Sequence, residues 1–344
     1  MHYADVLQGV ADHAAGLLVR FLPGHPVLII INRTAGTGVR HHQIQATVRS
    51  LDPPDLTPTE EAHLECCVTT VWTDAAAVLP DTMGRWLARV RRMFKTDPVV
   101  VSLGGDGTHN AVMQAGRNLS GNVIYCRLPL GSGNDAVPVV SLEEALTALQ
   151  GPQVPQWIPA VTVRTAGGAE YRAFNIASVG IDAYVTMLHH RFRSRLPGNT
   201  YRIIANPALL FYETLVGLTE MTVTVGAEGL PPRRVMLLAL GVTGNRTYGD
   251  HIRILPDSRN LCMVHQAGLL QKFAMKKKLL RGEHVNETHT VMGQTERVEL
   301  HYPGKLPLQV DGEALWLHRE DFPVTMELEH QSVQTLQPPG PGGE

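Results

Sequence analysis

Through the first part of the chain, short apolar runs alternate with segments whose apolar residues recur at helical spacing. Short apolar runs are typical of strands that are buried on both faces, and their alternation with helices predicts a parallel sheet covered by helices on each side. Ahead of the first strand, residues 4–21 predict an amphipathic helix that packs on the protein or on a partner. The predicted strands cover residues 27–31, 66–72, 99–103 and 123–127.

Beyond residue 157 the pattern changes to many short β-type runs, with a helical insertion at about 181–215. Such a series predicts a sandwich or a barrel-like pair of sheets. The predicted fold class is therefore an N-terminal parallel-sheet α/β domain with a C-terminal, mostly β sandwich domain. The predicted parts are an N-terminal helix at 1–24, the α/β domain at 25–156, the β-rich domain at 157–306, a return segment at 307–330 and a disordered tail at 331–344.

The charge balance and the hydropathy pattern exclude several classes of protein. The formal net charge is −2, so the chain lacks the global basic field of a nucleic-acid-binding protein, and no nucleic-acid partner is expected. No apolar run reaches the roughly 18–20 residues of a membrane span. The N-terminus lacks the basic region of a signal peptide, so we expect a cytoplasmic protein.

The four cysteines do not predict a metal or redox site. Cys66 and Cys67 are adjacent in a predicted strand, and Cys126 and Cys262 lie far from them in the sequence. Because no zinc-type Cys/His spacing appears, all four are predicted to be reduced core residues. The Pro- and acid-rich residues 51–61 ahead of them predict an exposed loop.

Three of the predicted strands end in turns that combine small residues with hydrogen-bonding side chains. Glycine amides at a strand-to-helix turn suit phosphate, because N–H groups and the helix N-terminus point at the anion. Asp106 would repel phosphate unless Mg²⁺ or a substrate hydroxyl lies between them; the alternative is that Asp106 only caps the helix. Parallel strands end at one edge, so the turns are expected to line one crevice. The turns run from Asn32 to Gly38, from Gly104 to Thr108 and from Pro129 to Asp135.

In order and spacing, these turns and three later motifs resemble the diacylglycerol kinase catalytic-domain family. That family includes sphingosine and ceramide kinases and the soluble bacterial lipid kinases, and the resemblance extends from Val27 to about Val324. The later motifs are Asn175 to Ala183, Gly198-Asn199-Thr200-Tyr201 and Gln309-Val310-Asp311-Gly312-Glu313. The resemblance implies a nucleotide-binding domain at 25–156 and a β-rich substrate domain at 157–306.

The resemblance also implies an activity: Mg²⁺-dependent transfer of the γ-phosphoryl group of ATP to a lipid hydroxyl, most simply that of diacylglycerol. Asp106 would lie near Mg²⁺ and the γ-phosphate, and Asp106, Asp311 or Glu313 would accept the hydroxyl proton. A simple hairpin turn is the alternative for Asp311 to Glu313. The implied nucleotide-binding residues are Asn32, Gly36, Gly38, Gly104, Gly105, Gly107, Thr108, Gly131, Ser132, Asn134 and Asp135.

One segment departs from the family pattern. Arg259-Asn260 stands where the family has Asp-Gly, close to an expected structural Mg²⁺ site, which leaves Asp257 as a substitute ligand. This departure keeps open a catalytically inactive regulator that binds nucleotide or lipid. The alternative enzyme is NAD kinase, which shares the Gly-Gly-Asp-Gly-Thr loop; its Asn-Glu and Pro-Thr-Gly-Ser segments are not assembled in this chain.

A lipid kinase without a membrane span has to meet its substrate at a membrane surface. Two basic clusters suit the anionic head groups of the inner membrane face, and an ordinary solvated basic face is the alternative. A homodimer remains open. The clusters are Arg191, Arg193 and Arg195, and Lys272, Lys276, Lys277, Lys278 and Arg281.

Overall fold

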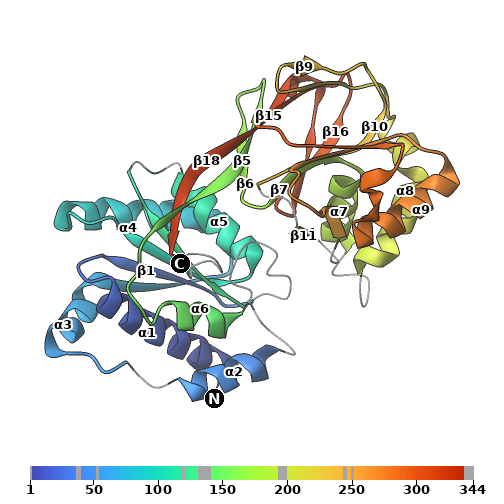
Figure 1. Ribbon diagram of the computed structural model, residues 1–344. Coiled ribbons are helices and arrows are strands. Elements are labelled where there is room, and N and C mark those ends of the chain that lie inside the picture. The colour runs from blue at the N-terminus through green and yellow to red at the C-terminus, as the bar shows by residue number, and fades with distance from the viewer. Residues whose placement is uncertain are drawn as a thin grey trace. The chain divides into compact units, whose positions relative to one another are not determined.

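The chain folds into two compact units, as the computed structural model in Figure 1 shows. Unit 1 consists of Met1–Ile158 with Gln331–Glu344, and unit 2 of Pro159–His330. Unit 1 is built on a parallel sheet and unit 2 on antiparallel sheets, which confirms the predicted fold class. The structure describes residues 2–35, 40–51, 54–117, 119, 121–130, 141–192, 200–242, 246–248 and 252–336.

The sheet of unit 1 has the strand order β2-β1-β3-β4, and the last residues of β18 pair in parallel with β4. Every residue of β3 and β4 is buried, as expected for strands covered on both faces. The strands are β1 (Val27–Asn32), β2 (Val68–Thr73), β3 (Val99–Gly104), β4 (Ile124–Pro129) and β18 (Val324–Leu336).

Helices cover both faces of this sheet (Figure 1). On one face, α1 buries Val10, Ala14 and Leu17 against Ile29 and Ile31 of β1, so the apolar side of this helix packs on the protein and not on a partner. The helices are α1 (Tyr3–Phe21), α2 (Arg40–Ser50), α3 (Pro58–Cys67), α4 (Leu79–Met93), α5 (Asp106–Arg117) and α6 (Leu142–Ala148), with a 3-10 turn at Ala76–Val78.

The start of α3 corrects two predictions. Residues 58–61 are helical and not part of a loop, and Cys66 and Cys67 end the helix instead of opening a strand. The cause is a capping box: the Thr57 hydroxyl accepts the Glu60 N–H, and the Glu60 carboxylate accepts the Thr57 N–H at 2.7 Å. All four cysteines are free, but Cys66 is exposed, so its prediction as a core residue was wrong.

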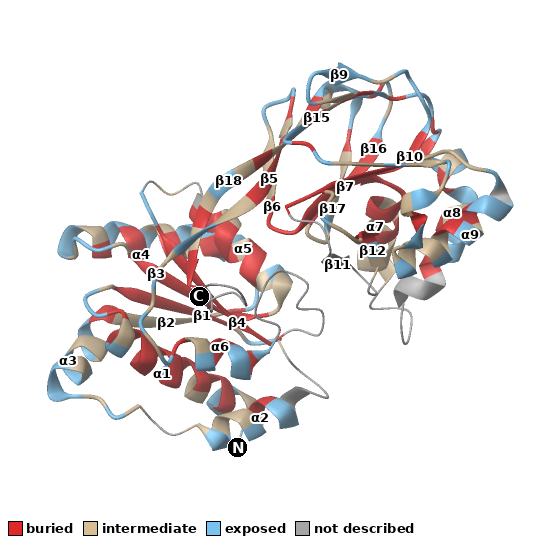
Figure 2. Cartoon of the chain, viewed as in Figure 1, coloured by how far each residue is buried: buried red, intermediate tan, exposed pale blue. Residues whose placement is uncertain are grey.

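Unit 2 is a β sandwich with helices on the outside of one sheet (Figure 2). One sheet has the order β14-β13-β10-β7-β16-β17, and the other contains β18-β15-β8-β9, with β5 beside β18 and β6 beside β5. The apolar inner faces of both sheets form one core, in which Val179, Leu238, Leu308 and Val324 are buried. The first sheet comprises β7 (Ile176–Gly180), β10 (Val235–Gly241), β13 (Leu261–His265), β14 (Thr290–Gly293), β16 (Leu306–Val310) and β17 (Glu313–Leu317).

The helices of unit 2 pack on the outer face of the first sheet and bury a second apolar cluster there, which includes Met236, Ala239 and Tyr212. The helices are α7 (Ile181–Phe192), α8 (Thr200–Val216) and α9 (Leu269–Arg281). The remaining elements are β5 (Gln156–Thr165), β6 (Glu170–Ala173), β8 (Thr222–Val225), β9 (Glu228–Gly229), β11 (Arg246–Tyr248), β12 (Ile252–Leu255), β15 (Arg297–His301) and the 3-10 turns Glu283–Asn286 and Arg319–Asp321.

The C-terminal segment is ordered further than its composition predicts. Residues 331–336 belong to β18 and are not a disordered tail. Gln334, Thr335 and Leu336 pair with β4, and Leu336 is buried in the core of unit 1. A partner strand about two hundred residues earlier provides this order. Residues 337–344 lie outside the described residues.

Candidate functional site

The strands that carry the three predicted turns end at the same edge of unit 1. β1 and β4 both pair in parallel with β3, and the register places Ile31 opposite Leu103 and Gly104 opposite Pro129. The turns after these strands therefore start side by side, as the sequence predicts. Six of the predicted residues lie outside the described residues: Gly36, Gly38, Gly131, Ser132, Asn134 and Asp135.

A hydrogen bond joins the first turn to the second. The side-chain amide of Asn32 donates to the hydroxyl of Thr108 at 2.7 Å, and Asn32 Oδ1 accepts from the N–H and the hydroxyl of Thr34, each at 2.9 Å. Gly104 makes room for this contact, because a Cβ at position 104 would lie 2.7 Å from the Thr108 side chain. The structure thus brings together three of the predicted nucleotide-binding residues.

Asp106 is the first residue of α5, and its carboxylate forms an ion pair with Arg127 of β4. The Arg127 side chain is only 7 % exposed, whereas that of Asp106 is 26 % exposed. Arg127 is not among the residues predicted from the sequence, although a single charge within a buried strand is itself a signal, since such a charge requires a partner. The pair fixes the direction of the carboxylate at the turn.

The surroundings of Asp106 suit a phosphate with a divalent cation. The N-terminus of α5 carries partial positive charge, and there is open space beside Gly107, where a Cβ would meet no atom within 4 Å. Mg²⁺ is commonly held by one or two carboxylates together with substrate phosphates, so the partly exposed oxygens of Asp106 fit such an ion.

Below this turn a buried histidine is neutral. Burial, and to a lesser degree the charge of Arg127, lowers the pKa of His109 to about 3. Its Nδ1 lies 2.7 Å from the hydroxyl of Ser102 on β3, and both residues are buried. This hydrogen bond fastens α5 to β3 without adding a positive charge beneath the turn.

In unit 2, Asp311 and Gly312 form the turn of the β16–β17 hairpin. Both have positive φ, 48° and 88°, which matches the two-residue Asp-Gly turns that join antiparallel strands. The hairpin, which was the alternative for this motif, is therefore present as local structure. Glu313 is the first residue of β17, and its side chain is exposed.

The Asp311 carboxylate is tied to the segment that leads into β7. Oδ1 accepts the N–H groups of Asn175 and Ile176, each at 2.9 Å, and Oδ2 accepts that of Phe174 at 2.6 Å. Charge-assisted bonds to backbone N–H groups are among the stronger hydrogen bonds in proteins. The carboxylate therefore anchors two segments that are far apart in sequence, a role that the sequence analysis did not foresee.

From the same hairpin, a chain of hydrogen bonds leads to Asp182 on α7. The Gly312 N–H donates to Gln309 Oε1 at 2.8 Å, Gln309 Nε2 donates to the Ser178 hydroxyl at 2.8 Å, and that hydroxyl donates to Asp182 Oδ2. Gln309 and Ser178 have 0 % exposure. Asp182 Oδ1 has no hydrogen-bond partner among the described residues.

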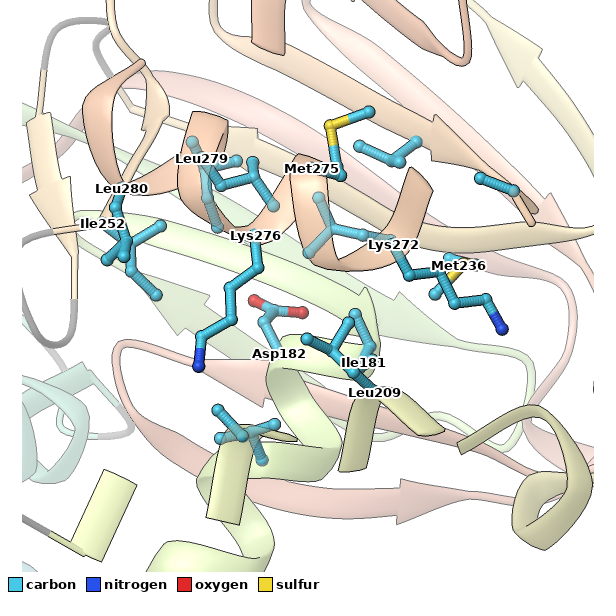
Figure 3. Close-up of a pocket in the computed structure, with 16 residues that line it drawn as sticks. Ile181, Asp182, Leu209, Met236, Ile252, Lys272, Met275, Lys276, Leu279 and Leu280 are labelled. Atoms are coloured by element: carbon cyan, nitrogen blue, oxygen red, sulfur yellow. The ribbon is translucent and has the colours of Figure 1, made fainter. Parts of the chain in front are cut away.

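Asp182 lies in the wall of a cavity enclosed by α7, α8, α9 and the outer face of the sheet (Figure 3). We call it the three-helix cavity; its empty space, including the open mouth, is about 780 Å³. Its wall is mostly apolar, with Leu209, Met236 and Leu279 among the lining residues. A wall of this polarity suits an apolar ligand with one polar group.

Two lysines of the predicted basic cluster turn toward this cavity. Lys272 lines it and is only 7 % exposed, with its Nζ 2.7 Å from Glu213 Oε1, so it does not face solvent as the sequence analysis expected. Lys276 also lines the cavity, and its Nζ donates to Asn206 Oδ1 at 2.8 Å. Arg193 and Arg195 of the other basic cluster lie outside the described residues.

Asp182 gives unit 2 a pH-dependent stability. Burial raises its pKa to about 6, although the Ser178 hydrogen bond opposes the rise. The folded protein therefore holds a proton that the unfolded chain has lost between about pH 4 and 6, so this residue's contribution to stability falls as the pH rises through that range. Against an ordinary pKa near 3.8, the change amounts to about 3 kcal/mol.

We predict that Asp182→Asn removes the part of the pH dependence of stability that comes from this carboxyl group. The difference in unfolding free energy between variant and wild type, measured by urea denaturation, should shift by about 2 kcal/mol in favour of the variant from pH 4 to pH 6. Ser178→Ala serves as a control that keeps the carboxyl group. A difference that stays flat across this range would contradict the prediction.

In the segment that departs from the family pattern, Asp257 and Arg259 form an ion pair. Arg259 binds the Asp257 carboxylate through its backbone N–H at 2.9 Å and through its guanidinium, and these contacts lower the pKa of Asp257. The Asn260 side chain is buried and bonds to the backbone of Thr295. The Asp257 carboxylate, expected as a substitute Mg²⁺ ligand, thus contacts a guanidinium in this structure.

The chain matches two protein-family models along most of its length. The model of the diacylglycerol kinase catalytic domain matches residues 26–153, and that of the YegS C-terminal NAD kinase beta sandwich-like domain matches residues 175–337. Among curated proteins, a diacylglycerol kinase of Bacillus subtilis is 25 % identical over 227 residues, which cover 62 % of this chain and 71 % of that protein.

Solved structures share the fold. A diacylglycerol kinase and a putative diacylglycerol kinase, both from Bacillus anthracis, superpose with TM-scores of 0.57 and 0.59 at 16 % sequence identity. Each match covers 92 % of this chain, and 97 % and 98 % of the respective neighbour. At this identity the likeness establishes the architecture alone.

Proposed function

Because this chain belongs to the diacylglycerol kinase catalytic-domain family, we propose that it transfers the γ-phosphoryl group of Mg-ATP to the hydroxyl group of diacylglycerol or a related lipid. The observation that carries the lipid acceptor is the three-helix cavity. An acyl chain needs an apolar wall, and this cavity supplies one with the Asp182 carboxyl group set in it.

At the edge of unit 1, the proposal gives each residue a physical task. Asn32, Thr108 and the N–H groups at the start of α5 bind phosphate oxygens, which positions ATP for transfer. Mg²⁺, when bound, neutralises phosphate charge, and Asp106 is the residue that would hold it. Arg127 keeps the Asp106 carboxylate in place through the ion pair described above.

The lipid hydroxyl has to lose its proton as its oxygen bonds to phosphorus, and a carboxylate oxygen accepts it. We assign this proton to Asp106 or Glu313, since both side chains are at least partly exposed. The oxygens of Asp311 are engaged by three backbone N–H groups, which makes Asp311 a positioning residue for the hairpin that carries Glu313.

The direct test is lipid-dependent release of ADP from Mg-ATP. Mixed micelles would contain diacylglycerol, monoacylglycerol, sphingosine, ceramide or phosphatidylglycerol, and NAD would be a separate acceptor. Turnover on a lipid would support the proposal and name the acceptor. Turnover on NAD alone, or ATP binding without turnover on any lipid, would overturn it.

A pair of variants on α8 tests the cavity. Ala205 lines the cavity, whereas Leu210 on the same helix is 39 % exposed. Under the proposal, Ala205→Trp fills part of the cavity and raises the KM for a long-chain lipid while the KM for ATP stays unchanged. Leu210→Trp is the matched control, and an equal effect of both variants would remove the cavity from the proposal.

A membrane contact belongs to the same proposal. Phe211 and Leu215 lie one helical turn apart on α8 and are 56 % and 61 % exposed, and Leu270 on α9 is 85 % exposed. The helices that carry these side chains, α8 and α9, also line the three-helix cavity. We propose that the exposed side chains enter the membrane when the protein takes up lipid. No helix in the described part of the chain is long and apolar enough to cross a membrane.

If these side chains contact the membrane, their substitution should weaken binding to vesicles without changing turnover on a soluble lipid. Phe211→Glu with Leu215→Glu should weaken binding to phospholipid vesicles by at least about tenfold, because two exposed apolar side chains that would enter the membrane are lost. Turnover on a short-chain, water-soluble diacylglycerol should stay within about twofold of wild type. Thr214→Glu, an exposed change on the same helix, is the control. Unchanged vesicle binding in a sedimentation assay would contradict the prediction.

A further inference from the structure

The last turn of α3 gathers three soft metal ligands that have no part in the proposed kinase reaction. His63, Cys66 and Cys67 occupy positions i, i+3 and i+4, which share one face of a helix. Cys66 Sγ lies 3.0 Å from Cys67 Sγ, and Cys67 Sγ lies 3.4 Å from His63 Nδ1. All three ligand atoms lie within 4.8 Å of one another.

These separations are close to those of a shared zinc ion. Two thiolates bound at about 2.3 Å in tetrahedral geometry lie about 3.8 Å apart, and a thiolate and an imidazole nitrogen slightly less. Small rotations of the side chains therefore bring all three atoms to bonding distance. Cys67 is 3 % exposed while Cys66 is exposed, so protein encloses one side of the cluster and solvent reaches the other.

A disulfide is a poor alternative for this pair. The Cα atoms of adjacent residues are about 3.8 Å apart across a trans peptide, below the roughly 4.4 Å lower limit of ordinary disulfides. The end of a helix also favours a cation, because its free carbonyl groups carry partial negative charge. Both considerations favour a bound metal over an oxidised pair.

We propose that His63, Cys66 and Cys67 bind a soft d¹⁰ cation, with Zn²⁺ as the probe, and leave one coordination position open to solvent or to an external ligand. Each thiol gives up its proton as its sulfur binds the metal, and the imidazole binds through Nδ1. Bound metal would fix the last turn of α3 where the chain enters β2.

The test is a Zn²⁺ titration of the full chain under reducing conditions, in competition with a chromophoric chelator. The expected result is one Zn²⁺ per chain and a loss of affinity of more than about tenfold in Cys66→Ser, since even outer-shell partners of metal ligands are worth about 10- to 100-fold. Binding of Co²⁺ should give the sulfur-to-cobalt charge-transfer absorption that reports thiolate ligands.

Controls separate this cluster from other sources of binding. Glu65→Gln removes an exposed acid from the same helix, and Cys126→Ala removes a remote thiol; both should bind Zn²⁺ as wild type does. His63→Gln repeats the ligand test without touching a thiol, should Cys66→Ser fail to fold. Equal affinity in wild type and in both ligand variants, or no stoichiometric Zn²⁺ in wild type, would overturn the proposal.

Discussion

Replacing Asp106 with asparagine is expected to lower turnover on lipid by about a thousandfold, within the 10²–10⁴ range that acid–base groups contribute. The variant removes the charge that would face Mg²⁺ and the γ-phosphate. It keeps an oxygen that accepts the Arg127 hydrogen bond, so the fold should survive. Steady-state kinetics in mixed micelles measure the loss of turnover, and circular dichroism shows whether the variant is folded.

The ion pair makes the choice of substitution important. Asp106→Ala would leave the buried Arg127 charge without this partner, and such a loss destabilises proteins by about 3–5 kcal/mol. Loss of activity in Asp106→Ala alone would therefore be ambiguous, whereas in the folded Asp106→Asn it reports on chemistry. Turnover of Asp106→Asn within tenfold of wild type would remove Asp106 from the reaction.

Asp311→Asn is expected to cost both stability and activity. The amide nitrogen of asparagine would face a backbone N–H group instead of accepting from it, which leaves buried donors near residues 174–176 without partners. The free energy of unfolding should fall by about 2–4 kcal/mol and lipid turnover by at least about 100-fold. Chemical denaturation and kinetics on the same preparation test this.

The matched control is Glu313→Gln, two residues along the same hairpin. Its side chain is exposed, so its stability should change by no more than about 0.5 kcal/mol. A large loss of turnover in this stable variant would assign the proton acceptor to Glu313. If Asp311→Asn lost activity with no loss of stability, Asp311 would be the base and the anchoring role inferred here would be wrong.

The edge of the unit 1 sheet where the three predicted turns start was the most predictable part of the structure. Apolar strands followed by glycine-containing turns gave the order of elements, and parallel pairing of β1, β3 and β4 then placed the turns together. The charge of Arg127 inside a short apolar strand indicates that a partner exists, but it does not identify Asp106, which is 21 residues away in sequence.

The end of α3 shows how a small local error changes a chemical conclusion. In a strand, Cys66 and Cys67 point to opposite faces, which argues against a shared ligand. In the helix that the Thr57 cap starts, His63 and both thiols converge. The capping box from Thr57 to Glu60 was visible in the sequence, so this error was avoidable.

What the sequence by itself determined is local: which runs are strands, which turns offer amides and hydroxyls, and which motifs resemble the diacylglycerol kinase catalytic-domain family. Tertiary structure decided what depends on contacts between distant segments. It bound the Asp311 carboxylate to residues 174–176, connected Gln309 through Ser178 to Asp182, and enclosed Asp182 in an apolar cavity. The reason is physical: the ionisation and hydrogen bonding of a carboxyl group depend on its burial and its partners, and folding alone brings them together.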